Sequence, residues 1–128
     1  MDSRVLFSLE GKTILVTGAA GNLGRVLCSY LVHDGAKVIA VDIDMRGLEN
    51  LRRELDPGGN SMVLLSADLE DEASRVTLAE AVVRETKHLD GAVFAAAFVG
   101  TSALDGWAVS LAEQTLSAWR SALELNLI

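Results

Sequence analysis

The chain has 128 residues, of which 50% are hydrophobic and 23% charged, and its formal net charge is −7 at pH 7. This length allows one domain with a sizeable core, and a single proline argues against a disordered or linker-rich chain. The acidic balance argues against nucleic acid and anionic membrane as partners, since both reward basic patches, although backbone amides can still bind an anion locally.

The single cysteine, Cys28, rules out an internal disulfide, and its place in an apolar helical pattern predicts a packed core thiol. Residues 1–12 contain no long apolar stretch and no cleavage-like site, and the apolar run at residues 92–99 is too short to span a bilayer. No metal-ligand spacing appears, so we expect no bound metal. These features predict a cytoplasmic protein.

Residues 12–17, KTILVT, predict a buried strand because they are rich in β-branched residues and run uninterrupted into a glycine. From Asn22 the apolar spacing becomes helical, and Gly35 is placed to end that helix. Its packed face is predicted to hold Leu23, Val26, Leu27, Tyr30 and Leu31. Residues 36–44 predict a second strand, followed by a helix of mixed charge over residues 46–55 and the turn signal DPGGN.

The alternation continues through the second half of the chain. Residues 61–69 predict a third strand, and residues 89–98 predict a fourth. Between them, residues 71–88 predict a helix with acidic residues in its first turn and basic residues in its last, which is the arrangement that the helix dipole favours. A last helix is predicted to start near Leu111. Apolar strands alternating with helices predict an α/β fold, a Rossmann-like doubly wound parallel sheet in three α/β/α layers, with residues 1–128 as a single dinucleotide-binding domain.

Three glycines follow the first predicted strand in GAAGNLG and lead into a helix, which is the context in which such a triplet indicates dinucleotide binding. Gly18 permits the tight turn, Gly21 lets the backbone approach a pyrophosphate, and Gly24 lets the helix pack closely on the sheet. The amides at the start of the helix would face the phosphates. The alternative is a purely structural strand-to-helix turn.

Asp42 ends the second predicted strand, where a carboxylate can accept both ribose hydroxyls of an adenosine and repel a 2′-phosphate. The alternative role is to cap the following helix, which Asp44 could do equally well. No basic residue stands at positions 19, 20 or 43, and Arg46 reads as a solvated helix residue. The pattern therefore predicts NAD rather than NADP.

At this point the sequence resembles the short-chain dehydrogenase/reductase family over its whole length, with GKTILVTGAAGNLG matching that family's opening strand and cofactor loop. SADLED resembles the adenine-pocket segment, which implies that Asp68 meets the adenine amino group and that Leu69 lines the ring; capping of the next helix is an open alternative for Asp68. WRSALELNLI resembles the helix whose Asn, matched by Asn126, holds a water in the proton relay, although Asn126 is also consistent with a plain polar helix residue. The cofactor-binding residues implied are Gly18, Ala20, Gly21, Asn22, Leu23, Gly24, Asp42, Ile43, Asp68, Leu69, Ala95, Ala96 and Ala97.

Two departures from the family pattern stand out. The compact branch usually places its second glycine where this chain has Asn22, and the earlier Gly21 is commoner in the extended branch, which includes nucleotide-sugar epimerases and dehydratases. Residues 94–97 are Phe-Ala-Ala-Ala where the family usually has Asn-Asn-Ala-Gly, so the bracing of the sheet by two Asn side chains is lost, while small residues can still line the cofactor. The spacing from Trp119 to Asn126 favours the compact branch.

The family's catalytic Ser and Tyr-x-x-x-Lys are not found in the 128 residues, and the only tyrosine, Tyr30, reads as a core residue. We therefore expect the chain to be the N-terminal part of a longer protein. In the 128 residues taken alone, the fourth strand would be a bare apolar edge of the sheet, which favours aggregation. The function predicted is the NAD-binding part of an alcohol dehydrogenase or ketone reductase. The alternatives are part of an extended-branch epimerase or dehydratase, and a non-catalytic NAD-binding module or truncated product. The resemblance also implies a small-molecule substrate and a homo-oligomer at full length.

Overall fold

The computed structural model describes residues 6–97 and 109–126, in two compact units divided between Ala95 and Ala96. The strands of the first unit are β1 (Thr13–Thr17), β2 (Lys37–Asp42), β3 (Met62–Ser66) and β4 (Gly91–Phe94), and its helices are α2 (Asn22–His33), α3 (Met45–Leu55) and α4 (Glu72–Glu85). The described part of the second unit contains a 3₁₀ turn, η1 (Leu111–Glu113), and helix α5 (Leu116–Asn126).

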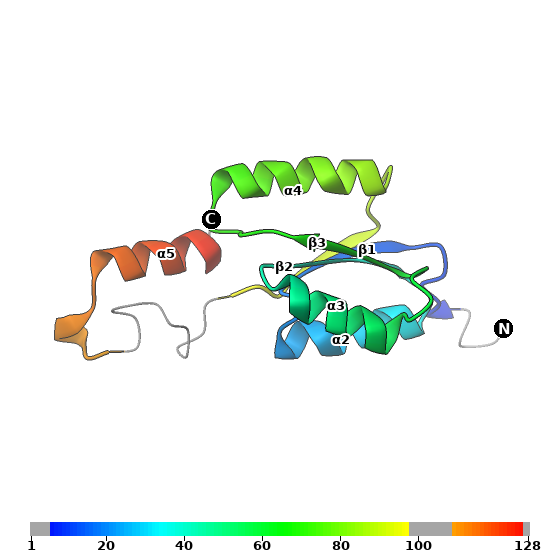
Figure 1. Ribbon diagram of the computed structural model, residues 1–128, viewed down its shortest axis with the longest axis horizontal. Helices are drawn as coiled ribbons and strands as arrows, with labels where there is room; N and C mark the ends of the chain where they lie inside the picture. Colours follow the sequence, from blue (N-terminus) through cyan, green and yellow to red (C-terminus); the bar gives the residue numbers. More distant parts are fainter. Residues whose placement is uncertain (1–5, 98–108, 127–128) are drawn as a thin grey trace. The chain divides into compact units, whose positions relative to one another are not determined.

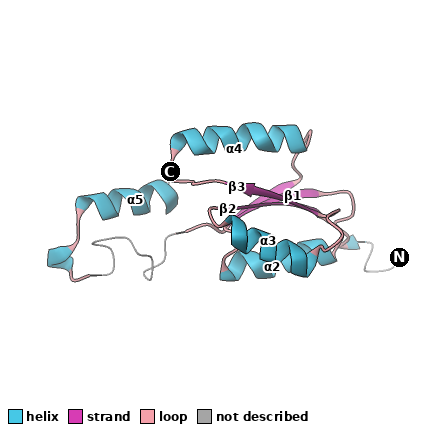
Figure 2. Cartoon of the chain, in the orientation of Figure 1, coloured by secondary structure: helices cyan, strands magenta, loops and turns pink. Residues whose placement is uncertain are grey.

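The sheet of the first unit is parallel throughout, with strand order β3-β2-β1-β4. Helices α2 and α3 cover one face and α4 covers the other (Figures 1 and 2). This arrangement confirms the predicted Rossmann-like class, because a parallel sheet must have both faces buried beneath crossover helices.

Alternate residues of the two central strands supply the two halves of the core. Val16 and Val38 belong to the cluster that holds Cys28 of α2 and Leu48 of α3. Leu15, Ile39 and Val41 belong to a second cluster, against which Leu78 and Val82 of α4 pack. Successive side chains of a strand point to opposite faces, so a continuous apolar run fills both layers.

The predicted packed face of α2 is wrong for three of its five residues. Leu23, Val26 and Tyr30 are exposed, whereas Gly24 and Cys28 are the buried residues of the helix. Tyr30, predicted to be a core residue, is 67% exposed. Gly24 lies against the backbone of residues 18 and 19, and Gly24, Cys28 and Leu31 face inward, at the i, i+4, i+7 spacing of one helix face.

Cys28 is a core residue, as predicted. Its side chain is fully buried, and burial raises the pKa of its thiol to about 11, because the thiolate would lose its hydration. An inert structural thiol is the result.

Several elements are shorter than predicted. The strands at residues 36–44, 61–69 and 89–98 end earlier, the last at Phe94. Residues 111–113 form a 3₁₀ turn, and the last helix begins only at Leu116. Phe94 is 79% exposed, and β4 alternates between half-buried and exposed residues, so it is not an evenly buried strand.

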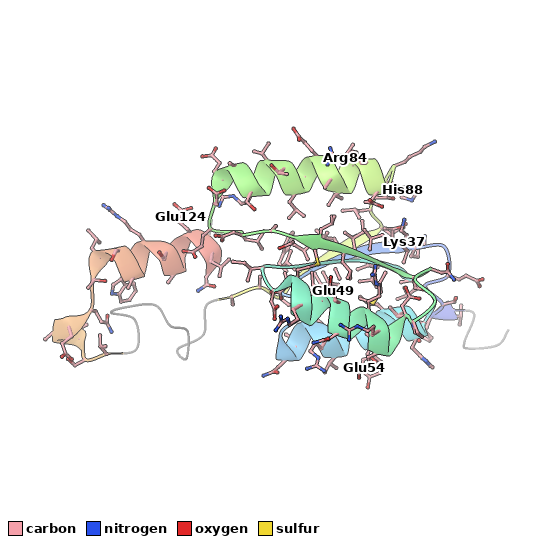
Figure 3. All side chains as sticks on the ribbon, viewed as in Figure 1. Lys37, Glu49, Glu54, Arg84, His88 and Glu124 are labelled. Carbon is pink, nitrogen blue, oxygen red and sulfur yellow. The ribbon has the colours of Figure 1, made fainter. Side chains whose placement is uncertain are left out.

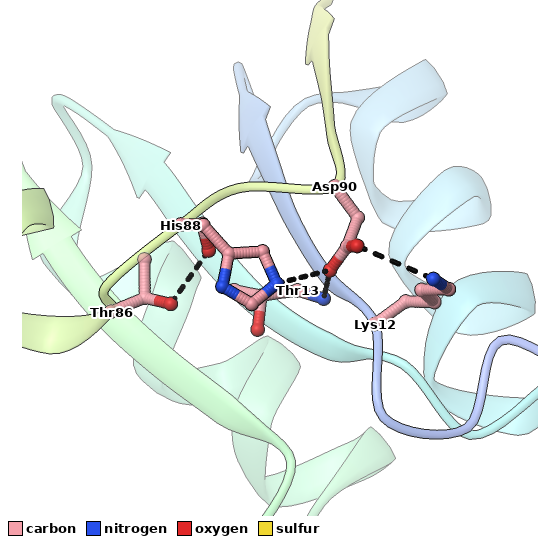
Figure 4. A network of polar contacts seen from close by, with 5 residues as sticks. All are labelled: Lys12, Thr13, Thr86, His88 and Asp90. Atoms are coloured by element: carbon pink, nitrogen blue, oxygen red, sulfur yellow. Dashed lines mark hydrogen bonds and ion pairs between the residues drawn. The ribbon is translucent and has the colours of Figure 1, made fainter.

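Asp90 joins the amino ends of β1 and β4 (Figure 4). Its carboxylate accepts a hydrogen bond from the amide of Thr13 (2.8 Å) and pairs with Lys12 (3.4 Å) and His88 (3.7 Å). The Thr13 amide, with Lys12 and His88, holds the pKa of Asp90 below its usual value. This network lies at the edge opposite the glycine turn.

The turn after α3 is held by Asp56, which is buried. Its carboxylate accepts hydrogen bonds from the amides of Asn60 (3.2 Å), Ser61 (2.8 Å) and Met62 (2.9 Å). One side chain thus satisfies three amides at the start of β3.

Charged side chains occupy the outer faces of the helices, as Glu54 on α3 and Arg84 on α4 illustrate (Figure 3). Glu54 pairs with Arg25 of α2 at 3.6 Å. Within the described ranges, no helix combines the length and the apolar character needed to cross a bilayer.

Candidate functional site

The four strands of the first unit end at one edge of the sheet, where the register pairs Thr17 with both Val41 and Phe94, and Asp42 with Ser66. Backbone hydrogen bonds continue past the strands: Ala19 donates to Val41, Ala67 to Asp42 and Ala95 to Thr17. The segments that follow β1, β2, β3 and β4 therefore meet at this carboxyl edge, which is where open parallel sheets bind ligands.

The segment after β1 is a tight glycine turn. Gly18 has φ +65°, a conformation that L side chains rarely adopt, and its carbonyl accepts a hydrogen bond from the amide of Gly21 (3.0 Å). A Cβ on Gly24 would lie 2.0 Å from the Gly18 carbonyl oxygen and 2.8 Å from the Ala19 Cα. The predicted role of Gly18 in the tight turn is confirmed, and Gly24 allows a close approach of the helix to the backbone of that turn.

The amino end of α2 is open to an anion. Gly21 is its N-cap and brings no side chain to the first-turn amides, and Gly21, Asn22 and Leu23 are all exposed. A Cβ on Gly21 would come 3.2 Å from the Gly18 carbonyl oxygen, so glycine relieves a close contact inside the turn. The amino end of a helix that no side chain caps fits a phosphate group.

Asp42 ties the glycine turn to the end of β2. Its Oδ2 accepts from the amide of Ala20 (3.0 Å), and its Oδ1 accepts from the amide of Asp44 (3.0 Å). The alternative role, capping of α3, belongs to Asp44, whose Oδ1 accepts from the amide of Gly47 (3.0 Å). Asp42 thus presents a half-buried carboxylate beside the turn, followed by Ile43, which is 67% exposed.

The segment after β3 contains Asp68 and Leu69. Asp68 does not cap α4, since Asp71 does so through the amide of Ser74 (2.9 Å); Asp68 instead accepts from the amide of Glu70 (3.0 Å). Leu69 is half-buried and packs against the core cluster on the α4 side of the sheet.

The remaining predicted site residues lie at or beyond the end of the first unit. Ala95 directly follows β4 and is half-buried. Ala96, Ala97 and Asn126 belong to the second unit, with Asn126 as the last residue of α5. The cofactor contacts of all these residues, and the catalytic role of Asn126, stay predictions.

Gly47 is a residue of this edge that the sequence reasoning missed. A Cβ there would lie 2.6 Å from Asp44 Oδ2 and 2.9 Å from the Ala20 Cβ, so glycine allows α3 to begin against the glycine turn. The available signal was a glycine in the first turn of a predicted helix, which costs helix stability and usually has a packing reason.

The comparisons with known proteins agree with this geometry. The family model described as short chain dehydrogenase matches residues 12–128. The chain belongs to the short-chain dehydrogenase family. Members of this family are enzymes that use a nicotinamide cofactor for hydride transfer.

Among its short-chain dehydrogenase relatives, the chain is 32% identical to D-threitol dehydrogenase of Mycolicibacterium smegmatis, an alignment that covers 94% of this chain and 44% of the relative. It is 31% identical to the rhamnolipids biosynthesis 3-oxoacyl-[acyl-carrier-protein] reductase of Pseudomonas aeruginosa, with the same coverage of 94% and 44%. The chain spans less than half the length of these two relatives.

The solved structures include the Pseudomonas aeruginosa RhlG/NADP active-site complex, with a TM-score of 0.80 and 27% identity over 94% of this chain and 44% of that one. Across the part of the chain that the structure describes, no group of three or more His, Cys, Asp or Glu residues could hold a metal ion.

Proposed function

We propose that this chain binds NAD at the carboxyl edge of β1 and β2, and that the whole protein is a NAD-dependent oxidoreductase of the alcohol dehydrogenase or ketone reductase type. The observation that carries the proposal is the Asp42 carboxylate, which is hydrogen-bonded to the Ala20 amide of the glycine turn. A carboxylate at this point accepts the two hydroxyls of an adenosine ribose and disfavours a 2′-phosphate.

Different residues of this edge would bind different parts of the dinucleotide. The turn from Gly18 to Gly24 and the amino end of α2 would hold the pyrophosphate, and Asp42 the ribose. Exposed Ile43, with Asp68 and Leu69, would meet the adenine, because an apolar side chain left exposed beside a polar site suits a flat ring. Residues 95–97 would line the cofactor farther along, and Asn126 would hold a water in the proton relay.

The names of the two relatives, a dehydrogenase and a reductase, support chemistry between an alcohol and a ketone. When bound, the nicotinamide ring supplies the hydride acceptor or donor. By the family resemblance, proton transfer at the substrate oxygen would need a Ser and a Tyr-x-x-x-Lys, and these 128 residues contain no Tyr-x-x-x-Lys. For the whole protein we propose a small-molecule substrate, a homo-oligomer and a cytoplasmic location.

Calorimetric titration of the chain with NAD and with NADP tests the cofactor proposal. Wild type is expected to bind NAD more tightly, and Asp42→Asn to narrow the ratio of the two dissociation constants by about tenfold, the size of one lost charged hydrogen bond. Asparagine keeps an acceptor oxygen for the Ala20 amide while removing the charge.

Asp34→Asn is the matched control, since Asp34 is exposed beyond the other end of α2 and should leave the ratio unchanged. Equal affinity of wild type for the two dinucleotides would refute the NAD preference. Binding of neither would refute the site.

A further inference from the structure

The segment that follows β3 runs beside the segment that follows β2. The Ala67 amide donates to the carbonyl of Asp42 (3.1 Å). The Ser66 hydroxyl donates to the carbonyl of Ile43 (3.4 Å). Asp68 comes next in the chain, so it lies close to the residues that the proposed function assigns to the adenosine. The direction of its carboxylate therefore matters for what this edge offers to an adenine ring.

The Asp68 carboxylate is oriented by the peptide group that joins Leu69 to Glu70. The amide of Glu70 donates to Asp68 Oδ1 (3.0 Å), a local turn that aspartate side chains commonly form. The carbonyl of the same peptide group, that of Leu69, accepts from Arg75 Nη1 (2.7 Å). The same nitrogen also donates to the carbonyl of Glu70 (3.1 Å). Arg75 thus fixes the peptide plane whose N–H holds the Asp68 side chain.

The backbone of Asp68 is held from the same helix. Its amide donates to Ser74 Oγ (2.9 Å), and its carbonyl accepts from the amide of Asp71 (3.2 Å). Ser74 and Arg75 are neighbours in the first turn of α4. Two consecutive residues of one helix therefore restrain Asp68, Ser74 directly at the backbone and Arg75 through the following peptide group.

Helix stability does not favour arginine at position 75. The amino end of a helix carries partial positive charge, which favours an acidic residue such as Glu72 and disfavours a cation. Arg75 is nevertheless half-buried and directed back at two carbonyls of the preceding segment. Hydrogen bonds from a charged group are stronger than neutral ones, so these contacts offset the unfavourable position. The arginine serves the segment before the helix rather than the helix itself.

We propose that Arg75, together with Ser74, is a positioning residue of the dinucleotide site, which holds the Asp68 carboxylate in the direction of the adenine amino group. This inference rests on the proposed function, in which Asp68 meets that group. Neither Arg75 nor Ser74 would touch the ligand. Their effect is to fix a carboxylate before binding, so that less interaction energy is consumed in ordering it.

The test compares NAD with the analogue that carries purine in place of adenine and so lacks the amino group. The analogue removes the donor to Asp68 and adds no new one. Wild type should therefore bind NAD about tenfold more tightly than the analogue in calorimetric titration, the size of one charged hydrogen bond.

Arg75→Met keeps an unbranched apolar stem and removes the donors of the guanidinium. In this variant the ratio of the two dissociation constants, analogue over NAD, should fall about three- to fivefold, the cost of ordering one side chain on binding. Ser74→Ala removes the acceptor of the Asp68 amide and should lower the same ratio. Arg84→Met is the matched control, since Arg84 is exposed in the last turn of the same helix (Figure 3).

The ratio separates positioning from a merely structural role. A structural role for Arg75 lowers the free energy of unfolding in urea, or weakens both ligands by the same factor, and leaves the ratio unchanged. An unchanged ratio in Arg75→Met therefore overturns the inference, whatever its stability. If Arg75→Met does not fold, Ser74→Ala decides in the same way. A ratio that falls in these two variants and not in Arg84→Met supports the inference.

The wild-type measurements distinguish this inference from the proposed function. If wild type binds NAD and the purine analogue equally, Asp68 makes no contact with the amino group, and the inference is overturned while NAD binding stands. If wild type binds neither NAD nor the analogue, the proposed function fails and this inference fails with it.

Discussion

Replacement of Gly24 by alanine tests the close contact on which the glycine turn depends. The new Cβ would lie 2.0 Å from the carbonyl oxygen of Gly18 and 2.7 Å from its carbonyl carbon, whereas real Cβ contacts are essentially never shorter than 3.0 Å. The obstacle is the backbone of the glycine turn, which cannot rotate away as a side chain can, so helix α2 and the turn must separate by about 1 Å. Forced overpacking of this kind costs about 1–3 kcal/mol or more.

The direction of the effect is informative because alanine is otherwise the better helix residue. At an uncrowded helix position, Gly→Ala would stabilise the fold by about 1 kcal/mol. We expect Gly24→Ala instead to lower the free energy of unfolding by at least about 2 kcal/mol, measured by urea unfolding monitored by circular dichroism.

Gly58→Ala is the control, since a Cβ there would meet only the side-chain amide of Asn60, at 3.4 Å. That change should stay within about 1 kcal/mol of wild type. A Gly24→Ala chain that is as stable as wild type, or more stable, would show that the helix does not press on the turn and would refute the reasoning.

Three further changes probe contacts away from the glycine turn. Asp56→Ala leaves three amides without their acceptor and should lower the free energy of unfolding, measured with urea, by about 3 kcal/mol. An unchanged free energy of unfolding would show that other contacts hold the turn. Cys28, with its pKa raised to about 11, should react with a thiol reagent at pH 8 about 100-fold more slowly in the folded chain than in urea, and equal rates would contradict its burial. Asp90 has a lowered pKa when folded, so its contribution is present above its unfolded pKa and is lost as the pH falls through its folded pKa. The stability gap between wild type and Asp90→Asn, from acid titration of the unfolding free energy, should therefore be widest near neutral pH and close in acid; a gap that is constant with pH would contradict the Thr13 contact.

The parts of the fold that were predictable from sequence are those with local physical causes. Uninterrupted apolar runs identify β1, β2 and β3, and acidic N-cap residues mark the starts of two helices, Asp44 for α3 and Asp71 for α4. The glycine turn could be assigned from its place between strand and helix. These features depend on neighbours in the chain and need no knowledge of distant contacts.

The orientation of α2 could not be predicted by counting apolar residues. Leu23, Val26 and Tyr30 form an apolar stripe, yet Gly24 and Cys28 face the sheet because small residues allow the closest approach. Val26 and Tyr30 instead line a groove between α2 and α3. Backbone contact with the turn therefore outweighs the burial of larger side chains on this helix.

At the candidate site the sequence indicated the acidic residues Asp42 and Asp44, but not which of the two caps α3. Asp42 had two open roles, and the structure gives the capping of α3 to Asp44, while the ribose role of Asp42 stays a prediction. Gly47 was missed because its role depends on the approach of α3 to Ala20, a contact between residues far apart in the sequence.

The hydrogen bond from Ala20 to Asp42 has a consequence for the thermodynamics of ligand capture. Two hydrogen bonds hold the glycine turn against β2, from the Ala20 amide to Asp42 and from the Ala19 amide to Val41, so the turn is preorganised. A dinucleotide bound there, as we propose, would meet a turn whose conformational entropy is already lost, and less of its interaction energy would be consumed in ordering a loop. The same restraint should protect the Ala19 and Ala20 amides from hydrogen exchange in the ligand-free chain, and it makes β2 as much a support of the glycine turn as β1.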